Sequence, residues 1–146
     1  MILDIKKIGE KVLREKSKNV DVINKEIEDL VKNMESTLRD SKGVGLAAPQ
    51  VGVLKRIILV MPEDKAYVFI NPEYKNRSKE VFCDYEGCLS LPGENIKIKR
   101  SKKVTLQFIG VDGEIYEVEA RNFFARIIQH EIDHLDGKLI VDYKER

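Results

Sequence analysis

The stretch NFFARIIQHEIDHLDG at residues 122–137 decides the fold. Asn122 is a residue type that caps helix N-termini and Gly137 is one that ends helices, so a helix is predicted between the two. Apolar residues occupy most of the circumference of this helix, which is typical of a helix inside a domain. The rest of the chain is therefore expected to fold around it.

Short runs of β-branched and aromatic residues precede this helix and predict mostly antiparallel strands. The runs are RIILVM (56–61), AYVFINP (66–72), KEVFCDY (79–85), KKVTLQFI (102–109) and EIYEVEA (114–120). Polar turn residues separate them. The expected fold class is α+β, with antiparallel strands wrapped around the central helix.

A second helix is predicted from Val22 to Lys42, where apolar residues recur at three- and four-residue steps and form one stripe. Gly43 follows as the expected C-cap. The segment GVGLAAPQVG at 43–52 is too rich in glycine and alanine to continue the helix, contains a proline, and is predicted to be a loop. At 146 residues the chain fits one domain, predicted to span residues 1–146.

The charge balance gives no broad electrostatic attraction to nucleic acid or to acidic membranes, because 26 basic side chains face 25 acidic ones. The amino terminus alternates charged and apolar residues, without the continuous apolar run of a secretory signal or a membrane span. A cytoplasmic protein is expected. In that reducing compartment Cys83 and Cys88 are poor candidates for a structural disulfide and better ones for a buried thiol or a metal ligand.

The motif QHEIDH at 129–134 predicts a metal site. His130 and His134 lie one helical turn apart, about 5 to 6 Å between β-carbons, so both imidazoles can reach one ion. Glu131 sits beside them, where its carboxylate can take a proton from water that a zinc-like ion has acidified to a pKa of about 7. The alternative is a chance spacing on a core helix, but the chain's only two histidines both fall in this motif.

The third ligand must come from upstream, because only twelve residues follow His134 and they contain neither a later helix that carries a Glu or His nor the HxxGxxH extension of the common zinc proteases. Cys88, in EGCLSLPG at 86–93, is the leading candidate. A thiolate and two imidazoles leave a fourth position open for water, which is the arrangement of a catalytic site. Cys83 is predicted to be a buried strand thiol.

Three motifs in this order resemble those of the peptide deformylase family: GVGLAAPQ at 43–50, EGCLS at 86–90 and QHEIDH at 129–134. The segment IKKIGEKVLREKSKNV at 5–20 is similar to the family's opening segment. The resemblance implies a metal-dependent hydrolase that removes the N-formyl group from the N-terminal formylmethionine of newly synthesised peptides and releases formate. Its partners would be N-formylmethionyl nascent peptides near the ribosome.

The resemblance also implies roles for single residues. The metal ligands would be Cys88, His130 and His134. Glu131 would be the general acid and base, and the side-chain amide of Gln50 and the backbone N–H of Leu89 would stabilise the oxyanion. Gly45 would let the chain pass close to an extended substrate. The family is known for ferrous iron in cells, while Zn²⁺, Ni²⁺ and Co²⁺ suit the same donors.

Two further residues are candidates for substrate binding. Ile127 and Phe123 project from the same helix face as the two imidazoles and could form an apolar wall for the methionine side chain. The alternative is that both are ordinary core residues. At Asn95 many family members place an arginine near the substrate backbone, so one substrate contact is in doubt.

Alternative functions remain at this point. A compact zincin-type peptidase is disfavoured by the missing downstream ligand, and a metal-binding module or inactive relative by the presence of Glu131 and Gln50. A nucleotide loop at 43–50 would need a preceding strand, a following helix and a third glycine, whereas a helix precedes it and Ala48 takes the third position. Formate release from formyl-Met-Ala-Ser, compared with internal peptide cleavage and with simple binding, separates the deformylase, the peptidase and the metal-binding module.

Overall fold

The computed structural model describes residues 1–144; the last two residues of the predicted domain, 145–146, lie outside this part. Within it the α+β prediction is confirmed. The elements in chain order are η1 (Lys11–Arg14), α1 (Lys25–Ser41), β1 (Gly45–Ala47), η2 (Ala48–Val51), β2 (Ile57–Val60), β3 (Tyr67–Arg77), β4 (Val81–Cys88), β5 (Leu91–Ser101), β6 (Lys103–Ile109), β7 (Ile115–Arg121), α2 (Asn122–Leu135) and η3 (Ile140–Tyr143), where η marks a short 3₁₀ helix.

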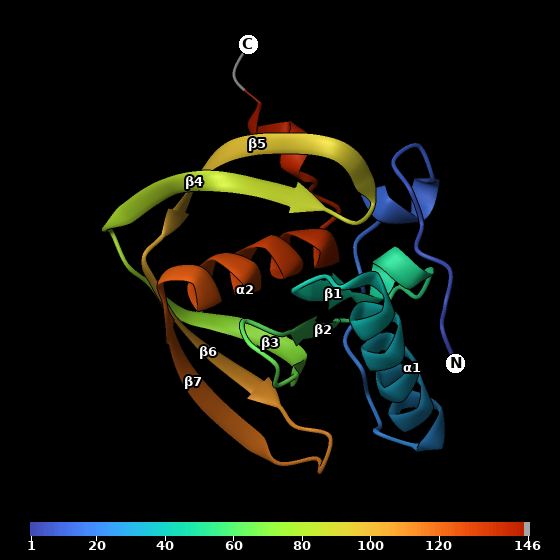
Figure 1. Ribbon diagram of the computed structural model, residues 1–146. Coiled ribbons are helices and arrows are strands. Elements are labelled where there is room, and N and C mark those ends of the chain that lie inside the picture. Colours follow the sequence, from blue (N-terminus) through green and yellow to red (C-terminus); the bar gives the residue numbers. More distant parts are fainter. Residues whose placement is uncertain (145–146) are drawn as a thin grey trace.

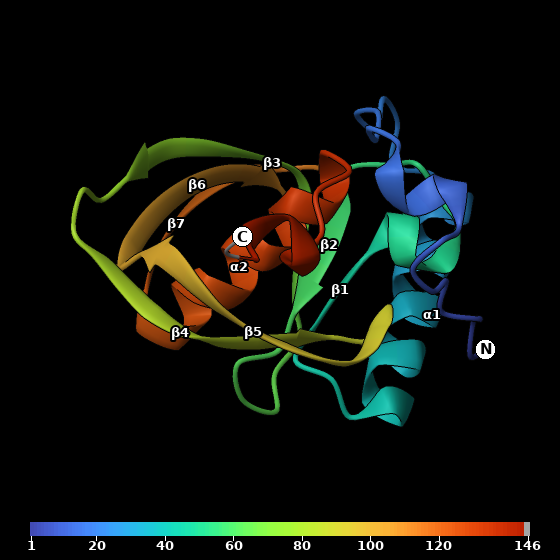
Figure 2. The same cartoon turned by 90° about the horizontal axis from the view of Figure 1, so that it is seen from above.

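The strands form two antiparallel sheets that enclose α2. Five strands pair in the order β1-β2-β3-β6-β7, and β4 and β5 form a separate hairpin. In Figure 1 the helix α2 lies between this hairpin and the larger sheet, while α1 stands at the side of β1. The view from above in Figure 2 shows the same enclosure, with α1 on the far side of β1 and β2 from α2. The helix that carries the histidine pair is therefore central, as expected.

Strand β2 explains how the sheet holds both helices. All four of its residues are buried, because it has a helix on each face. Ile58 and Val60 pack in the cluster that contains the inner face of α2, whereas Ile57 and Leu59 pack with α1. Burying each such side chain stabilises the fold by about 1.5 to 3 kcal/mol.

Helix α1 begins where a side chain caps it. The Asn24 side chain accepts a hydrogen bond from the backbone N–H of Ile27 at 3.1 Å, so the helix starts later than the predicted Val22. Gly43 was expected as the C-cap, and this is wrong: Lys42 takes that position with a left-handed φ of 57°.

The predicted loop at 43–52 is also wrong in part, because it contains strand β1 and the 3₁₀ helix η2. Strand β1 forms through pairing with β2, Gly45 opposite Val60, rather than through local preference. Strand β5 was not predicted at all. Cys83 lies on a strand as expected, but its side chain is exposed, so the prediction of a buried thiol is wrong.

Asn122 begins α2, but it does not cap the helix. Arg121 occupies the N-cap position without a side-chain capping bond. Asn122 has a φ of 57°, a left-handed conformation that asparagine adopts more readily than most residues. Its role is thus to turn the chain sharply from β7 into α2. Among the described residues, no helix is both long and apolar enough to span a membrane.

Candidate active site

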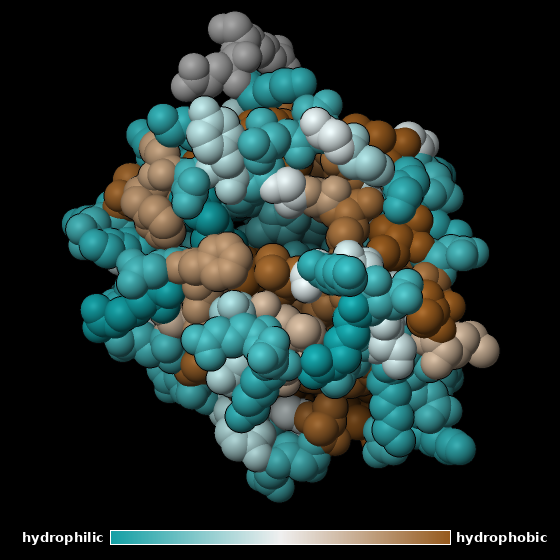
Figure 3. Space-filling model, in the orientation of Figure 1, coloured by the Kyte–Doolittle hydropathy of each residue, from teal (hydrophilic) through white to brown (hydrophobic). Residues whose placement is uncertain are grey.

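A cavity of about 430 Å³ opens between α2, the β4–β5 hairpin and the segment around β1. Figure 3 shows this face hollowed near its centre, with polar residues in the depth and apolar ones around them. The cavity is lined by residues from these three parts of the chain, namely Lys42, Gly43, Val44, Gly45, Gln50, Tyr85, Glu86, Gly87, Cys88, Leu89, Leu91, Gly93, Glu94, Phe123, Arg126, Ile127, His130 and Glu131. Segments far apart in the sequence therefore contribute to one site.

Three potential metal ligands lie together here, and two of them, Cys88 and His130, line this cavity. One ligand atom each from Cys88, His130 and His134 lies within 4.8 Å of the others. Helix α2 places its two imidazoles one turn apart, with ring centroids separated by 5.2 Å, and Cys88 ends β4 with its Sγ atom 3.3 Å from Nε2 of His134. The pairing register shifts between Glu86 and Cys88, an irregularity of the kind that re-aims side chains beside active sites.

Glu86 holds His130 in place and was given no role by the sequence analysis. Nδ1 of His130 and Oε1 of Glu86 are 2.8 Å apart. If Nδ1 carries the proton and donates it to the carboxylate, the lone pair of Nε2 is left for a metal ion, as in many carboxylate–histidine–metal sites. The signal available in the sequence was a charged residue two positions before Cys88, on a strand where alternate side chains share a face.

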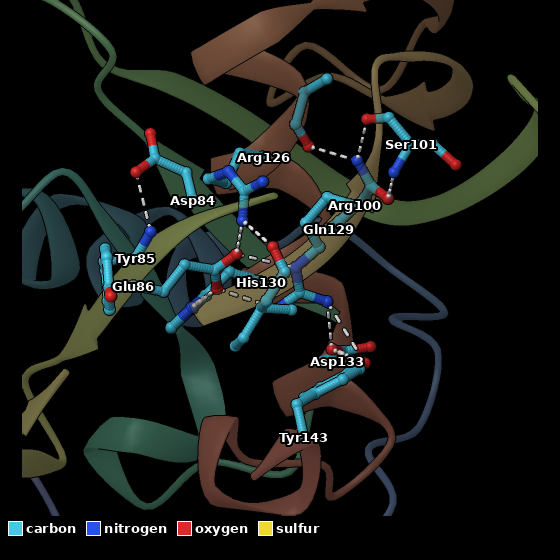
Figure 4. A network of polar contacts seen from close by, with 12 residues as sticks. Asp84, Tyr85, Glu86, Arg100, Ser101, Arg126, Gln129, His130, Asp133 and Tyr143 are labelled. Atoms are coloured by element: carbon cyan, nitrogen blue, oxygen red, sulfur yellow. Dashed lines mark hydrogen bonds and ion pairs between the residues drawn. The ribbon is translucent and has the colours of Figure 1, made fainter. Parts of the chain in front are cut away.

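Two arginines surround the same carboxylate (Figure 4). Arg100 donates to both oxygens of Glu86, at 2.8 and 2.9 Å, and Arg126 donates to Oε2 at 2.6 Å. Burial alone would raise the pKa of Glu86, but the hydrogen bonds from Arg100 and His130 outweigh it and lower the pKa to about 2. The carboxylate that orients His130 is therefore always charged near neutral pH.

Glu131 is the candidate proton carrier. Its side chain is buried, with Oε2 3.9 Å from Nε2 of His130, and within residues 1–144 its Oε1 has no hydrogen-bond partner. Burial raises the pKa of Glu131 to about 7. A group with such a pKa can both accept and return a proton near neutral pH, which general acid–base catalysis requires.

The structure brings Gln50 and Leu89 to the same place. Oε1 of Gln50 accepts a hydrogen bond from the N–H of Ala47 at 3.0 Å, which turns Nε2 toward Ser90 Oγ at 3.1 Å and Cys88 Sγ at 3.6 Å. Leu89 follows Cys88 directly and lines the cavity. Two potential hydrogen-bond donors thus lie beside the three potential metal ligands.

Gly45 has a structural constraint that the sequence did not indicate. A β-carbon built at this position would lie 2.5 Å from Oε2 of Glu131 and 2.8 Å from Cγ2 of Ile127. Both distances are too short for real side chains, so glycine is needed for the close packing of β1 against α2. The predicted contact of Gly45 with substrate stays a prediction.

Gly45→Ala is expected to lower kcat by about 100-fold with the metal still bound, because the added methyl group must displace the Glu131 carboxylate and small displacements of reacting groups are costly. Steady-state kinetics with metal analysis checks this. Gly87→Ala is a comparison, since it adds the same group to the same cavity but meets only Glu94 O at 3.6 Å. Equal losses in the two variants would show that crowding of Glu131 is not the cause.

Both predicted wall residues line the cavity. Ile127 is 4% exposed and also belongs to the core cluster, so it is a core residue with one side open to the cavity. Phe123 is 50% exposed, which excludes the alternative that it is an ordinary core residue. Asn95 stands where many family members have an arginine. It is exposed on β5 and does not line this cavity, whereas the preceding Gly93 and Glu94 do.

The donor set fits a divalent transition-metal ion. Burial lowers the pKa of His134 well below its ordinary value, so its imidazole is neutral and able to bind a metal. A thiolate and two imidazoles leave a coordination position for water, beside a buried carboxylate whose Oε1 lacks a partner among the described residues. Fold and site together define the class: a metal-dependent hydrolase built on an enclosed helix.

Comparisons with known proteins identify the family. The family model "Polypeptide deformylase" matches residues 2–146, and the chain belongs to this family. Peptide deformylase from Dictyoglomus turgidum is 46% identical over 142 residues, covering 97% of this chain and 92% of the relative. The family is metal-dependent and its known function is the deformylation of newly made peptides, so the chain is a hydrolase of this kind.

Solved structures agree with the assignment. The crystal structure of peptide deformylase from Thermotoga maritima has a TM-score of 0.97 and 35% identity, covering 100% of this chain and 99% of that one. The Met-Ala-Ser-bound class I type b peptide deformylase from Acinetobacter baumannii has a TM-score of 0.94 and 35% identity, covering 99% of both chains. The resemblance inferred from the three motifs is thereby confirmed.

Proposed function

We propose that this chain hydrolyses the formamide bond of N-formylmethionyl peptides with one divalent metal ion held by Cys88, His130 and His134. The observation that carries this proposal is the convergence of these three donors beside the buried carboxylate of Glu131. The Acinetobacter relative binds Met-Ala-Ser, a peptide that begins with methionine, which is the kind of ligand the proposal requires.

The proposed ion in the cell is Fe²⁺. When bound, the ion supplies a Lewis acid that polarises the formyl oxygen and acidifies water. Thiolate and imidazole donors suit Fe²⁺, Zn²⁺, Ni²⁺ and Co²⁺, so ligand chemistry alone does not select one. Metal analysis of protein purified without oxygen tests the choice: about one iron per chain supports it, and zinc in that amount overturns it.

Glu131 moves the proton in the proposed reaction. Its carboxylate accepts a proton from the water that attacks the formyl carbon, and it returns this proton to the amine nitrogen as the carbon–nitrogen bond breaks. The products are formate and a peptide with a free amino terminus. The unpartnered Oε1 and the raised pKa of Glu131 support this role.

Gln50 and Leu89 stabilise the negative charge on the formyl oxygen. The Nε2 group of Gln50 and the backbone N–H of Leu89 donate to this oxygen as the charge develops. The hydrogen bond from Ala47 to Oε1 of Gln50 fixes the direction of the amide before substrate arrives. Donors held in this way need no rearrangement during the reaction, which is why they lower its barrier.

The substrate backbone binds in an extended form along β1. This strand is at the edge of the five-stranded sheet, so the side of its backbone that faces away from β2 can pair with a peptide, except at the N–H of Ala47, which donates to Gln50. Gly45 allows the close approach. The methionine side chain then enters the apolar part of the cavity, where Ile127 and Phe123 form the wall.

Ile127→Asp is expected to lower kcat/KM for formyl-Met peptides at least tenfold, about 1.4 kcal/mol, with the metal still bound, because it places a charge in the methionine pocket. Steady-state kinetics and metal content provide the measurement. Thermal melting must accompany them, since a buried charge also destabilises the helix.

Ile132→Asp is the matched control. Ile132 lies on the same helix, is also 4% exposed and does not line this cavity. The Ile132→Asp variant should lose about as much thermal stability as Ile127→Asp does, but its folded fraction should keep the kcat/KM of the parent. If a folded, metal-loaded Ile127→Asp variant processes formyl-Met-Ala-Ser as well as the parent does, Ile127 does not line the methionine pocket.

The proposed setting is a single catalytic domain acting in the cytoplasm on nascent peptides near the ribosome, without direct binding to nucleic acid. The near balance of 26 basic and 25 acidic side chains supports the absence of direct binding to nucleic acid.

Mass spectrometry of formyl-Met-Ala-Ser after incubation tests the chemistry: equal amounts of formate and Met-Ala-Ser support the proposal. Cleavage of an internal peptide bond would indicate a peptidase, and an unchanged peptide a binding module.

A further inference from the structure

The short C-terminal helix η3 is connected to the metal site by hydrogen bonds (Figure 4). The Tyr143 hydroxyl donates to Oδ2 of Asp133 at 2.5 Å, and Nη1 of Arg100 contacts both, at 3.2 Å from the hydroxyl and 2.7 Å from Oδ2. The Arg100 guanidinium also lies over the Tyr143 ring, 4.8 Å from its centroid. Tyr143 therefore fixes Arg100 both through its ring and through its hydroxyl.

Arg100 carries this constraint to a metal ligand. Its other two nitrogens, Nε and Nη2, donate hydrogen bonds to the two oxygens of Glu86. Oε1 of Glu86 in turn contacts Nδ1 of His130. The path from η3 to the imidazole thus runs through Asp133, Arg100 and Glu86. Such a path transmits orientation because a bidentate arginine–carboxylate pair has one preferred geometry.

The charges along this path are balanced. Two arginines, Arg100 and Arg126, face two carboxylates, Glu86 and Asp133, and these four side chains are only 4 to 17% exposed. An unpaired charge at this depth is costly, so each partner constrains the others. Burial and the hydrogen bond with Asp133 raise the pKa of Tyr143 to about 12, so its hydroxyl keeps the proton that it donates.

We propose that Tyr143 is a positioning residue of the active site: by holding Asp133 and Arg100, it sets the orientation of the Glu86 carboxylate and hence of His130. The inference rests on the proposed metal site. It makes η3, which contributes no residue to the cavity lining, part of the support of the metal ligands.

Tyr143→Phe tests the proposal because it removes only the hydroxyl and keeps the ring over Arg100. Direct partners of metal ligands typically contribute about 10- to 100-fold in metal affinity, so a more remote partner is expected to contribute about three- to tenfold. Competition with a chelator measures the Kd for Co²⁺. The visible absorption spectrum of the Co²⁺ form, which reports ligand geometry, should shift.

Tyr116→Phe is the matched control, because Tyr116 donates to Asp112 in an exposed turn between β6 and β7. It should leave both the Co²⁺ affinity and the spectrum unchanged. Asp133→Asn, which retains the shape but removes the charge, should weaken Co²⁺ binding more than Tyr143→Phe does. Circular dichroism at the assay temperature verifies that every variant is folded.

The result that overturns the proposal is a Tyr143→Phe protein with the Co²⁺ affinity and spectrum of the parent. Failure of the underlying metal site would look different, because then the parent itself would not bind one equivalent of Co²⁺, or Cys88→Ser would bind it equally well. The two failures are therefore distinguishable in one set of titrations.

Discussion

Glu131→Gln is expected to keep its metal and to lose most of its turnover, by about 10²- to 10⁴-fold in kcat. Glutamine fills the same space beside His130, but it cannot accept a proton from water. The proposed metal ligands are other side chains, so metal content should stay near that of the parent. Anaerobic kinetics on formyl-Met-Ala-Ser, together with metal analysis of the same sample, measures both quantities.

The pH dependence of the parent's activity gives a second test of the role of Glu131. Burial raises the pKa of Glu131 to about 7, and a bound cation must lower it again, so activity should rise with pH as the carboxylate loses its proton. The acidic limb of the kcat/KM profile should be absent from any residual activity of Glu131→Gln. Substantial deformylation by this variant would show that Glu131 does not transfer the proton.

Cys88→Ala is expected to lose metal affinity and activity together. The Sγ atom of Cys88 is one of three converging donors, 3.3 Å from Nε2 of His134, and alanine offers no ligand in its place. Because partners of ligands already contribute about 10- to 100-fold in affinity, loss of a ligand itself should cost at least 100-fold. Chelator competition on the folded variant gives the affinity.

Cys83→Ala is the matched control for this change. Cys83 lies on the same strand, but its thiol is exposed and does not line the cavity. It should bind metal and turn over as the parent does. Unchanged metal content in Cys88→Ala would instead mean that Cys88 is not a metal ligand and that the third ligand lies elsewhere.

The central helix was predictable because its sequence carries two independent signals. Apolar residues around most of its circumference indicate burial, and the spacing of His130 and His134 indicates a shared ligand. The placement of Cys88 beside them was first a choice by elimination and then an implication of the family resemblance. The structure brings the three side chains together, but only metal binding tests their role.

Strand β1 could not be predicted from local preference. Its residues, Gly45–Ala47, favour turns or helices rather than strands, and the strand exists because β2 supplies a pairing partner. The same pairing brings Gly45 against Glu131, so the need for glycine at this position became visible only in three dimensions.

Strand β5 was missed because charged residues obscure its alternation. Ile96, Ile98 and Arg100 are all buried and alternate with exposed lysines. An arginine at an inward position looks like a solvent-exposed residue until its partner is known, and here Glu86 on the neighbouring strand is that partner. Glu86 was overlooked for the same reason, although it lies inside a recognised motif.

The most direct test of the account is formate release from formyl-Met-Ala-Ser while metal-free protein is titrated with Fe²⁺ in the absence of oxygen. With the proposed metal site, the rate is expected to rise linearly and to level off at one equivalent per chain, with formate and Met-Ala-Ser formed in equal amounts. Formate release by the metal-free protein, or metal binding at one equivalent without any formate, would contradict it.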